Sequence, residues 1–234
     1  MTPLRPVPAA LGHLSRTAGG APLLTHYGPG GERTELSVTS FANWVDKTTN
    51  LLDDLGAAAD DEVVLPVLAD RPAHWMGLIW PFALWRAGLC ASVAPAGAAG
   101  DAYLVVVGPH EPRPLAPLTL ACSLDPWGRG LTGLPDGVLD YSSEALAQPD
   151  AAAARPADPG KPAWVDAERS QTGAELSTLE PVADRVLAQP ATAFGAVSLL
   201  VRVVLGGGSV VLVEGPDADL ARIAASERAR VVVG

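Results

Sequence analysis

The sequence predicts an α/β fold in which layered parallel or mixed sheets are flanked by helices. Hydrophobic residues make up 48% of the 234 residues and charged residues only 18%, which is typical of a packed globular chain. Amphipathic helical patterns alternate with short β-branched runs, an order that favours parallel strands joined by right-handed crossovers. The order of helix, glycine, strand, acidic turn, helix and strand occurs in residues 41–93 and, in outline, again in 193–233. We therefore treat residues 1–234 as one region of this fold.

The clearest helix is predicted over residues 41–55. Its apolar residues recur at steps of three and four, Ser40 can cap its first turn, and Gly56 can close it. An acidic turn then leads to a β-branched run, residues 62–68, which predicts a buried parallel strand. Pro66 lies inside this run and favours an edge position or a bulge.

The next predicted helix, residues 73–87, is apolar nearly all round and must be buried on most sides. Gly88 ends it, and residues 89–93 return as a strand. Two further strands are expected at 102–107 and 118–122. A connection rich in Gly, Pro and Ala follows, and we expect a flexible linker at about residues 145–160.

A loop is predicted over residues 166–176, after the apolar run that ends at Val165. Ser177 and Glu180 have the spacing of a capping box and predict a helix to about residue 188. The remaining elements are a helix at 193–205 that stops at a glycine triplet, a strand at 209–213, a helix capped by Asp217 that runs to about 229, and a strand at 231–233.

Composition limits the partners and the compartment. The formal net charge of −10 makes nonspecific binding to nucleic acid or to an anionic membrane unfavourable, because both need a basic field. The two long apolar stretches are broken by charged residues, proline or glycine, so they indicate buried elements and not membrane spans. Cys90 and Cys122 fit a reducing cytoplasm, and we expect a cytoplasmic protein with the residue usage of a high-GC bacterial genome.

Few side chains have the spacing of a chemical site. The four histidines share no ligand spacing with each other or with the two cysteines, so no metal site is expected. A Cys122 nucleophile with His110 as its base lacks a third orienting group. Trp75, Trp80 and Trp85 lie on the apolar helix, where they either line an acyl pocket or form part of the core.

The order of these blocks resembles the N-terminal subdomain of the adenylate-forming superfamily, which includes acyl-CoA synthetases, adenylation domains and luciferases. The resemblance rests on residues 36–56, 61–65 and 84–88, and on residues 189–195 and 205–212. It implies the fold of that subdomain, a layered α/β arrangement.

The same resemblance points to a missing phosphate site. Family members hold the ATP phosphates with a loop rich in Ser, Thr and Gly that ends in Pro-Lys. At the corresponding place this chain has Ser170-Gln171-Thr172-Gly173, with Glu168 and Glu175 nearby and no lysine. Such loops need several glycines and a lysine to surround the anion. Ser170, Thr172 and Gly173 are the candidate remnant of a binding site, and Arg169 could partly replace the lost charge.

The family's later motifs, which hold adenine, magnesium and ribose and supply the catalytic lysine, would lie beyond Gly234. The resemblance therefore implies a truncated, degenerate relative with no catalytic residues and no metal. No cofactor is expected, and the alternative is that the chain binds ATP or AMP. We expect a binding or interaction module that forms a homo-oligomer or binds a partner protein. The alternative is half of an AMP-forming ligase that retains nucleotide or acyl-adenylate binding, or that a partner chain completes.

Overall fold

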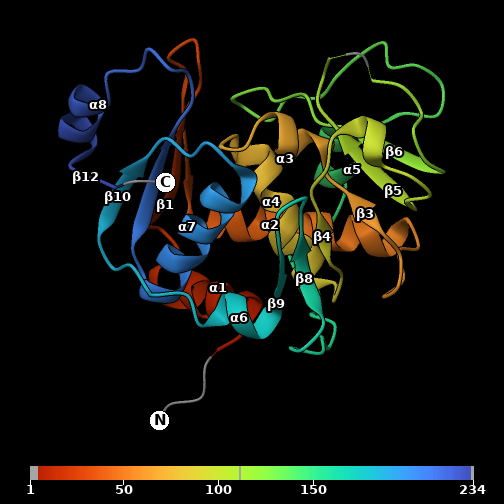
Figure 1. Cartoon of the computed structure of the whole chain (residues 1–234), viewed down its shortest axis with the longest axis horizontal. Coiled ribbons are helices and arrows are strands. Elements are labelled where there is room, and N and C mark those ends of the chain that lie inside the picture. The colour runs from red at the N-terminus through yellow and green to blue at the C-terminus, as the bar shows by residue number, and fades with distance from the viewer. Residues whose placement is uncertain (1–4, 111, 233–234) are drawn as a thin grey trace.

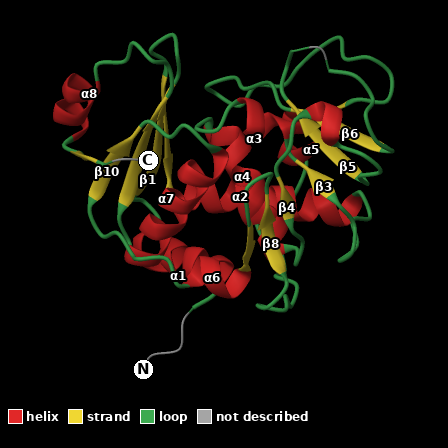
Figure 2. Cartoon of the chain, in the orientation of Figure 1, coloured by secondary structure: helices red, strands yellow, loops and turns green. Residues whose placement is uncertain are grey.

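Two sheets enclose a layer of helices in the computed structural model, which describes residues 5–110 and 112–232 (Figure 1). The helices between the sheets are α1 (Val7–Ala18), α2 (Val38–Asp54), α4 (Trp75–Arg86) and α7 (Ala193–Gly206). Their apolar side chains and those of both sheets form one continuous core. The layered α/β fold expected from the sequence is therefore confirmed (Figure 2).

The first sheet has five strands in the order β12-β10-β11-β1-β2. β1, β10, β11 and β12 are mutually parallel, whereas β2 pairs antiparallel with β1. Leu24 of β1 lies opposite Val210 of β11, so the first strand of the chain pairs with one of the last. The strands are β1 (Pro22–Tyr27), β2 (Arg33–Ser37), β10 (Arg185–Ala188), β11 (Ser209–Val213) and β12 (Arg230–Val231).

The second sheet has seven strands in the order β7-β6-β5-β3-β4-β8-β9. All neighbours are parallel except β8 and β9, which form an antiparallel hairpin. The strands are β3 (Val63–Val64), β4 (Ala91–Ser92), β5 (Leu104–Val107), β6 (Leu118–Ala121), β7 (Leu139–Asp140), β8 (Pro162–Val165) and β9 (Ser170–Thr172).

Alternation along the buried strands supplies apolar side chains to both faces of a sheet. In β11, Val210 and Leu212 belong to the central core, whereas Val211 and Val213 belong to a smaller cluster with Ile223 of α8 (Leu220–Glu227). This is the period-two pattern of a strand that is covered on both sides. The helix α8 therefore covers the outer face of the first sheet, opposite α7 (Figure 1).

The helix α4 confirms the prediction of a helix buried nearly all round. Every residue from Trp75 to Trp85 is buried, Pro81 included, and only Arg86 is partly exposed. The glycine after it, Gly88, has a φ of +76°, a conformation that L side chains rarely adopt. Trp75, Trp80 and Trp85 all belong to the main core.

Residues 62–68 correct the sequence analysis, because the predicted strand is only two residues long. β3 ends at Val64, and the short helix α3 (Pro66–Asp70) follows, with Pro66 at its first position. The fixed φ of proline suits the first helical turn, where its missing N–H has no partner to lose. The β-branched run therefore conceals a change from strand to helix.

The predicted helix at 177–188 is also wrong. The helix α6 (Gly173–Ser177) ends where that helix was expected to begin, and β10 occupies Arg185–Ala188. The capping box is formed by Thr172 and Glu175, so the helix starts inside the predicted loop. The loop itself is confined to the turn of the β8–β9 hairpin, residues 166–169.

Two predicted caps lie at neighbouring positions. The side chain that caps α2 is Ser37, not Ser40, and the one that caps α8 is Asp219, not Asp217. The strand at 209–213 and the helix at 193–205 are confirmed, and Gly207 ends α7 with a φ of +75°. The last predicted strand begins one residue earlier, at Arg230, and its final residue, Val233, lies outside the described residues.

Several elements had no prediction: α1, β1, β2, β7, the 3₁₀ turn η1 (Ala96–Ala98) and α5 (Tyr141–Leu146). After α5 the backbone is irregular up to β8, which agrees with a connection without regular structure. This segment makes specific contacts, however. Arg86 donates to the carbonyl of Ala152 at 2.6 Å, and the N–H of Arg155 donates to the carbonyl of Arg86 at 3.0 Å. Its flexibility stays a prediction.

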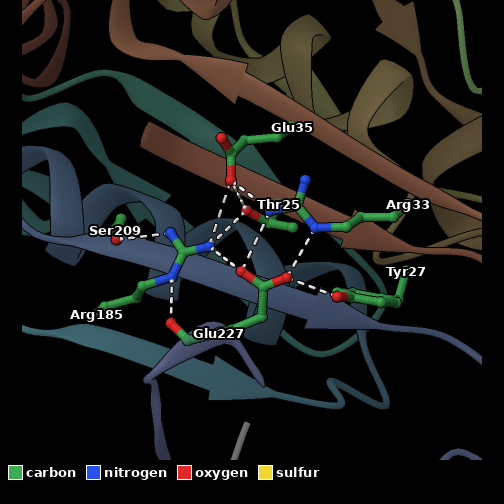
Figure 3. A network of polar contacts seen from close by, with 7 residues as sticks. All are labelled: Thr25, Tyr27, Arg33, Glu35, Arg185, Ser209 and Glu227. Atoms are coloured by element: carbon green, nitrogen blue, oxygen red, sulfur yellow. Dashed lines mark hydrogen bonds and ion pairs between the residues drawn. The ribbon is translucent and has the colours of Figure 1, made fainter. Parts of the chain in front are cut away.

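A polar network ties α8 to the first sheet (Figure 3). The carboxylate of Glu227, the last residue of α8, accepts hydrogen bonds from Arg33 at 2.7 Å, Arg185 at 2.6 Å and Tyr27 at 2.5 Å. Hydrogen bonding from Arg33, then from Tyr27 and Arg185, lowers the pKa of Glu227 to about 2 despite its burial. The helix is thus anchored by an ionised carboxylate with three donors.

Candidate functional site

The predicted site residues lie along the β8–β9 hairpin and the start of α6. Ser170 and Thr172 belong to β9, and Gly173 is the first residue of α6. The hydroxyl of Thr172 accepts the N–H of Glu175 at 3.1 Å, and the Glu175 carboxylate accepts the N–H of Thr172 at 2.7 Å. The polar groups of Thr172 are therefore already used by the cap of the protein's own helix.

The hairpin turn is filled by a carboxylate of the chain itself. One oxygen of Asp166 accepts the N–H groups of Glu168 and Arg169 at 2.8 and 3.0 Å. Its other oxygen accepts the indole N–H of Trp164 at 2.8 Å. Backbone N–H groups that converge in a turn are the usual donors for a phosphate. Here Asp166 takes these donors, so the turn offers them to no ligand.

The Arg169 side chain is held by other groups of the protein and is not available to bind a phosphate. Its guanidinium lies over the ring of Phe194, 4.6 Å from the centroid, and pairs with Glu168 at 2.6 Å. Such stacking stabilises an arginine against an aromatic face. The cation that could have replaced the missing lysine is therefore held by two groups of the protein.

A second location, the polar cleft, lies at the carboxyl ends of β1, β10 and β11. It is a cavity of about 470 Å³ whose walls include Gln189, Glu214 and Arg71, together with four prolines at positions 29, 72, 190 and 216. Ligands of open α/β sheets bind outside the carboxyl ends of parallel strands. A cavity with charged side chains in its walls therefore lies where such a site is expected.

Glu214 and Arg71 connect the two halves of the molecule across this cleft. Glu214 follows β11 of the first sheet, and Arg71 follows α3 beside the second sheet. The Arg71 guanidinium donates to both carboxylate oxygens, with Nε 3.2 Å from Oε1 and 3.1 Å from Oε2. Burial alone would raise the pKa of Glu214, but the nearby His26 and Arg71 outweigh it and lower the pKa to about 2. Glu214 is thus ionised and paired.

Two buried histidines lie behind this pair. His26 Nε2 is 3.3 Å from the Glu214 carboxylate, and the rings of His26 and His74 meet edge to face at 4.6 Å. His74 Nδ1 accepts the N–H of Met76 at 3.2 Å, so Nε2 must carry the proton that it donates to the carbonyl of Leu124. Burial, followed by the charge of His26, lowers the pKa of His74 to about 3. His74 is therefore neutral and capping.

These groups can hold a polar ligand but are poorly suited to proton transfer. A general base or acid acts best with a pKa near the working pH. The pKa values of Glu214 and His74 lie far below neutral pH, and both side chains are fixed by their partners. Within residues 5–110 and 112–232, no three His, Cys, Asp or Glu side chains gather in a way that could hold a metal ion.

The sequence and the fold were compared with those of known proteins. No family model matches the chain. A protein of Mycobacterium tuberculosis (strain ATCC 25618 / H37Rv) with the name "TIGR03089 family protein" is 38% identical over 128 residues, which are 52% of this chain and 51% of that protein. The matched segment thus spans about half the length of this relative.

The solved structures match nearly the whole chain. An acyl-CoA synthetase of Brucella canis has a TM-score of 0.76 at 15% identity, with 98% of this chain and 47% of that chain covered. The fold is that of the N-terminal region of acyl-CoA synthetases. A coronafacic acid ligase of Pectobacterium brasiliense agrees, with a TM-score of 0.71 at 8% identity over 95% of this chain and 48% of that chain. The chain spans about half the length of these enzymes.

Within the acyl-CoA synthetase fold, the polar cleft was missed by sequence reasoning. The residues that line the cleft come from four segments that are distant in the sequence. In the sequence, His26 and His74 were considered only as metal ligands. One signal was present: Glu214 directly follows the apolar run at residues 210–213, the position at which parallel sheets place functional side chains. None of the described helices has the length and apolar character needed to cross a bilayer.

Proposed function

We propose that this chain is a binding or interaction module built on the acyl-CoA synthetase fold, without adenylate-forming activity of its own. The observation that supports the proposal is the occupied hairpin turn. Asp166 takes the N–H groups of Glu168 and Arg169, where an incoming phosphate would need them. An anion placed there would also meet the negative charge of Asp166 and Glu168.

The chemistry of adenylation makes this loss severe. Transfer at a phosphoryl centre depends on donors and cations that are positioned before the transition state forms. The residues nearest the turn supply one cation, Arg169, and it is paired with Glu168 and stacked on Phe194. Ser170, Thr172 and Gly173 remain the proposed remnant of a site, and we expect at most weak binding of ATP or AMP there.

The direct test is ATP–pyrophosphate exchange with a panel of carboxylic acids. We expect the purified chain to show no exchange above that of a buffer blank, while an active acyl-CoA synthetase assayed beside it exchanges readily. The Asp166→Ala variant should also stay inactive, because no lysine is present to replace the lost clamp. Robust exchange by the purified chain would contradict the proposal.

The second candidate is a half-enzyme that a partner chain completes. It is favoured by one observation: the chain matches about half of the acyl-CoA synthetases that share its fold. Exchange that is absent from the purified chain but appears on addition of cell extract, and that depends on the chain, would support this candidate over the first. Thermal shifts with ATP, AMP and an acyl-adenylate analogue add a binding readout, since a ligand of the native state raises its apparent stability.

A module of this kind needs a partner, and we propose self-association or binding to another protein in the cytoplasm. Light scattering across a range of concentrations tests the first arm. A strictly monomeric protein at high concentration would rule out self-association. Affinity capture with the chain as bait would then have to show binding to another protein.

A further inference from the structure

A second cavity, here called the basal cavity, lies apart from the polar cleft and from the turn at residues 166–169, although Gly173 of the candidate remnant is among its lining residues. Its volume is about 330 Å³. It is bounded by the first turn of α1, the end of α4, the segment that leads into β8, and α6. This volume lies within the range of small-ligand sites.

The inner wall of the basal cavity is apolar and fixed in place. Trp85, Leu89 and Leu176 line it and are each at least nine-tenths buried. The indole N–H of Trp85 donates to the carbonyl of Ala163 at 2.7 Å, which fixes the ring against the wall. Prolines at positions 6, 8, 159 and 162 also line the cavity and stiffen its rim. An apolar ligand body would meet a preformed surface.

The lining of the basal cavity contains more basic than acidic side chains, which is unusual for this chain. Acidic residues outnumber basic ones by 26 to 16, yet the cavity is lined by Arg86, Arg155 and Lys161 and by one acid, Asp158. The Asp158 carboxylate accepts the N–H of Gly160 at 2.9 Å and so caps its own turn. Basic side chains therefore outnumber acidic ones in the lining, although Arg86 and Arg155 have carboxylate partners outside it.

Lys161 is the cation best placed to meet a ligand. Arg86 is paired with Asp46 at 2.7 Å, and Arg155 is paired with Asp53. The Lys161 side chain is 67% exposed, and its nearest carboxylate, the exposed Asp60, is 3.7 Å away. Exposed pairs of this kind contribute little, so Lys161 can exchange Asp60 for a ligand anion at small cost.

We propose that the basal cavity binds a small amphipathic anion, with its apolar body against Trp85 and Leu176 and its anionic group at Lys161. This site goes beyond the proposed function, which concerns the hairpin turn. The ligand chemistry is defined by two features of the cavity, its apolar wall and the exposed lysine in its lining. A carboxylate and a phosphate monoester could each supply the anionic head group.

Calorimetric titration with octanoate, octyl phosphate and neutral 1-octanol tests the proposal. Saturable binding of at least one anion, several-fold tighter than that of 1-octanol, is expected. Lys161→Glu should weaken anion binding about tenfold and leave 1-octanol unaffected. The matched control is Arg222→Glu, the same charge change at a 78% exposed side chain on α8. The stronger of the two anions identifies the head group.

A second variant tests the apolar wall. Ala9 is exposed on α1 and lines the cavity, so Ala9→Trp should fill it and abolish binding of all three probes without disturbing the core. Ala225→Trp, on the exposed face of α8, is the matched control. Thermal unfolding checks that each variant is folded. The proposal is overturned by a lack of saturable anion binding to the wild type, by equal affinity for 1-octanol, or by binding that survives both Lys161→Glu and Ala9→Trp. None of these outcomes alters the pyrophosphate-exchange test of the hairpin.

Discussion

The Arg185 guanidinium lies 2.6 Å from the Glu227 carboxylate and also donates from Nε to the backbone carbonyl of Glu227 at 3.0 Å. One arginine of β10 thus holds both the side chain and the backbone at the end of α8 (Figure 3). This double contact explains how a helix of eight residues is fixed on the outer face of the sheet.

Replacement of this carboxylate should loosen α8. We expect Glu227→Gln to lower the free energy of unfolding by about 1–3 kcal/mol, because charged hydrogen bonds to two arginines are lost. Since the pKa of Glu227 is lowered to about 2, its contribution is complete above pH 4.5 and disappears as the pH falls toward 2. Urea unfolding at pH 7 and pH 3 should therefore show a smaller difference from wild type at the lower pH. Glu35→Gln, at a more exposed partner of the same network, is the control and should have the smaller effect.

His74 should make the chain sensitive to mild acid. Its pKa is lowered to about 3 in the folded protein, below the ordinary value of 6.5. Proton binding therefore favours the unfolded chain, and stability that is complete above pH 6.5 should fall as the pH drops toward 3. His74→Asn keeps a residue type that caps helices but does not titrate, so its stability should depend less on pH in this range. An NMR titration in which His74 ionised near pH 6.5 would contradict the assignment.

Asp166 should matter for stability although it lies in a turn. Asp166→Ala removes the acceptor of two backbone N–H groups and of the Trp164 indole, and we expect a loss of about 1–3 kcal/mol in chemical denaturation. Glu168→Ala is the comparison. Its carboxylate is largely exposed and pairs only with Arg169, so a change within about 0.5 kcal/mol is expected. Equal effects of the two variants would argue against the role of Asp166.

Gly206 should tolerate no side chain. A Cβ at this position would lie 2.4 Å from the carbonyl oxygen of Val182, which is backbone and cannot move aside freely. Gly206→Ala should therefore destabilise the protein by about 1–3 kcal/mol or prevent folding. Gly20→Ala is the matched control, because a Cβ there meets nothing within 4 Å. Thermal unfolding of the two variants should separate them clearly.

The thiols of Cys90 and Cys122 should react slowly in the folded protein. Both are free, and burial raises the pKa of Cys90 to about 11 and that of Cys122 further. Since the thiolate is the reactive form, labelling by a disulfide reagent at pH 7 should be slow at Cys90 and should require unfolding at Cys122. Rapid modification of both thiols in the native protein would contradict this expectation.

The layered fold could be predicted because its signals are local. The period of residues 41–55 and the uniform apolar character of residues 210–213 each indicate burial without any knowledge of the partner. The errors lie where one pattern serves two structures. Residues 63–68 are apolar throughout, yet Pro66 begins a helix, and Thr172 with Glu175 forms the capping box that was assigned to Ser177.

The candidate site could be predicted only in part. The absence of a lysine and the presence of acids at the hairpin are visible in the sequence, and both were used. The way Asp166 fills the turn depends on the hairpin geometry, and the cleft between Glu214 and Arg71 joins positions 143 residues apart. No pattern in a single sequence marks a contact of that separation.

The place of β1 in the first sheet also bears on how the protein is made. β1 pairs with β2 within a local hairpin, but its other edge pairs with β11, which is synthesised about 180 residues later. Until residues 209–213 have left the ribosome, the apolar Leu23 and Leu24 have no sheet to join. Contacts of such long sequence separation slow folding and leave an open strand edge during the delay. The nascent chain should therefore depend on protection of β1 until residues 209–213 have been synthesised.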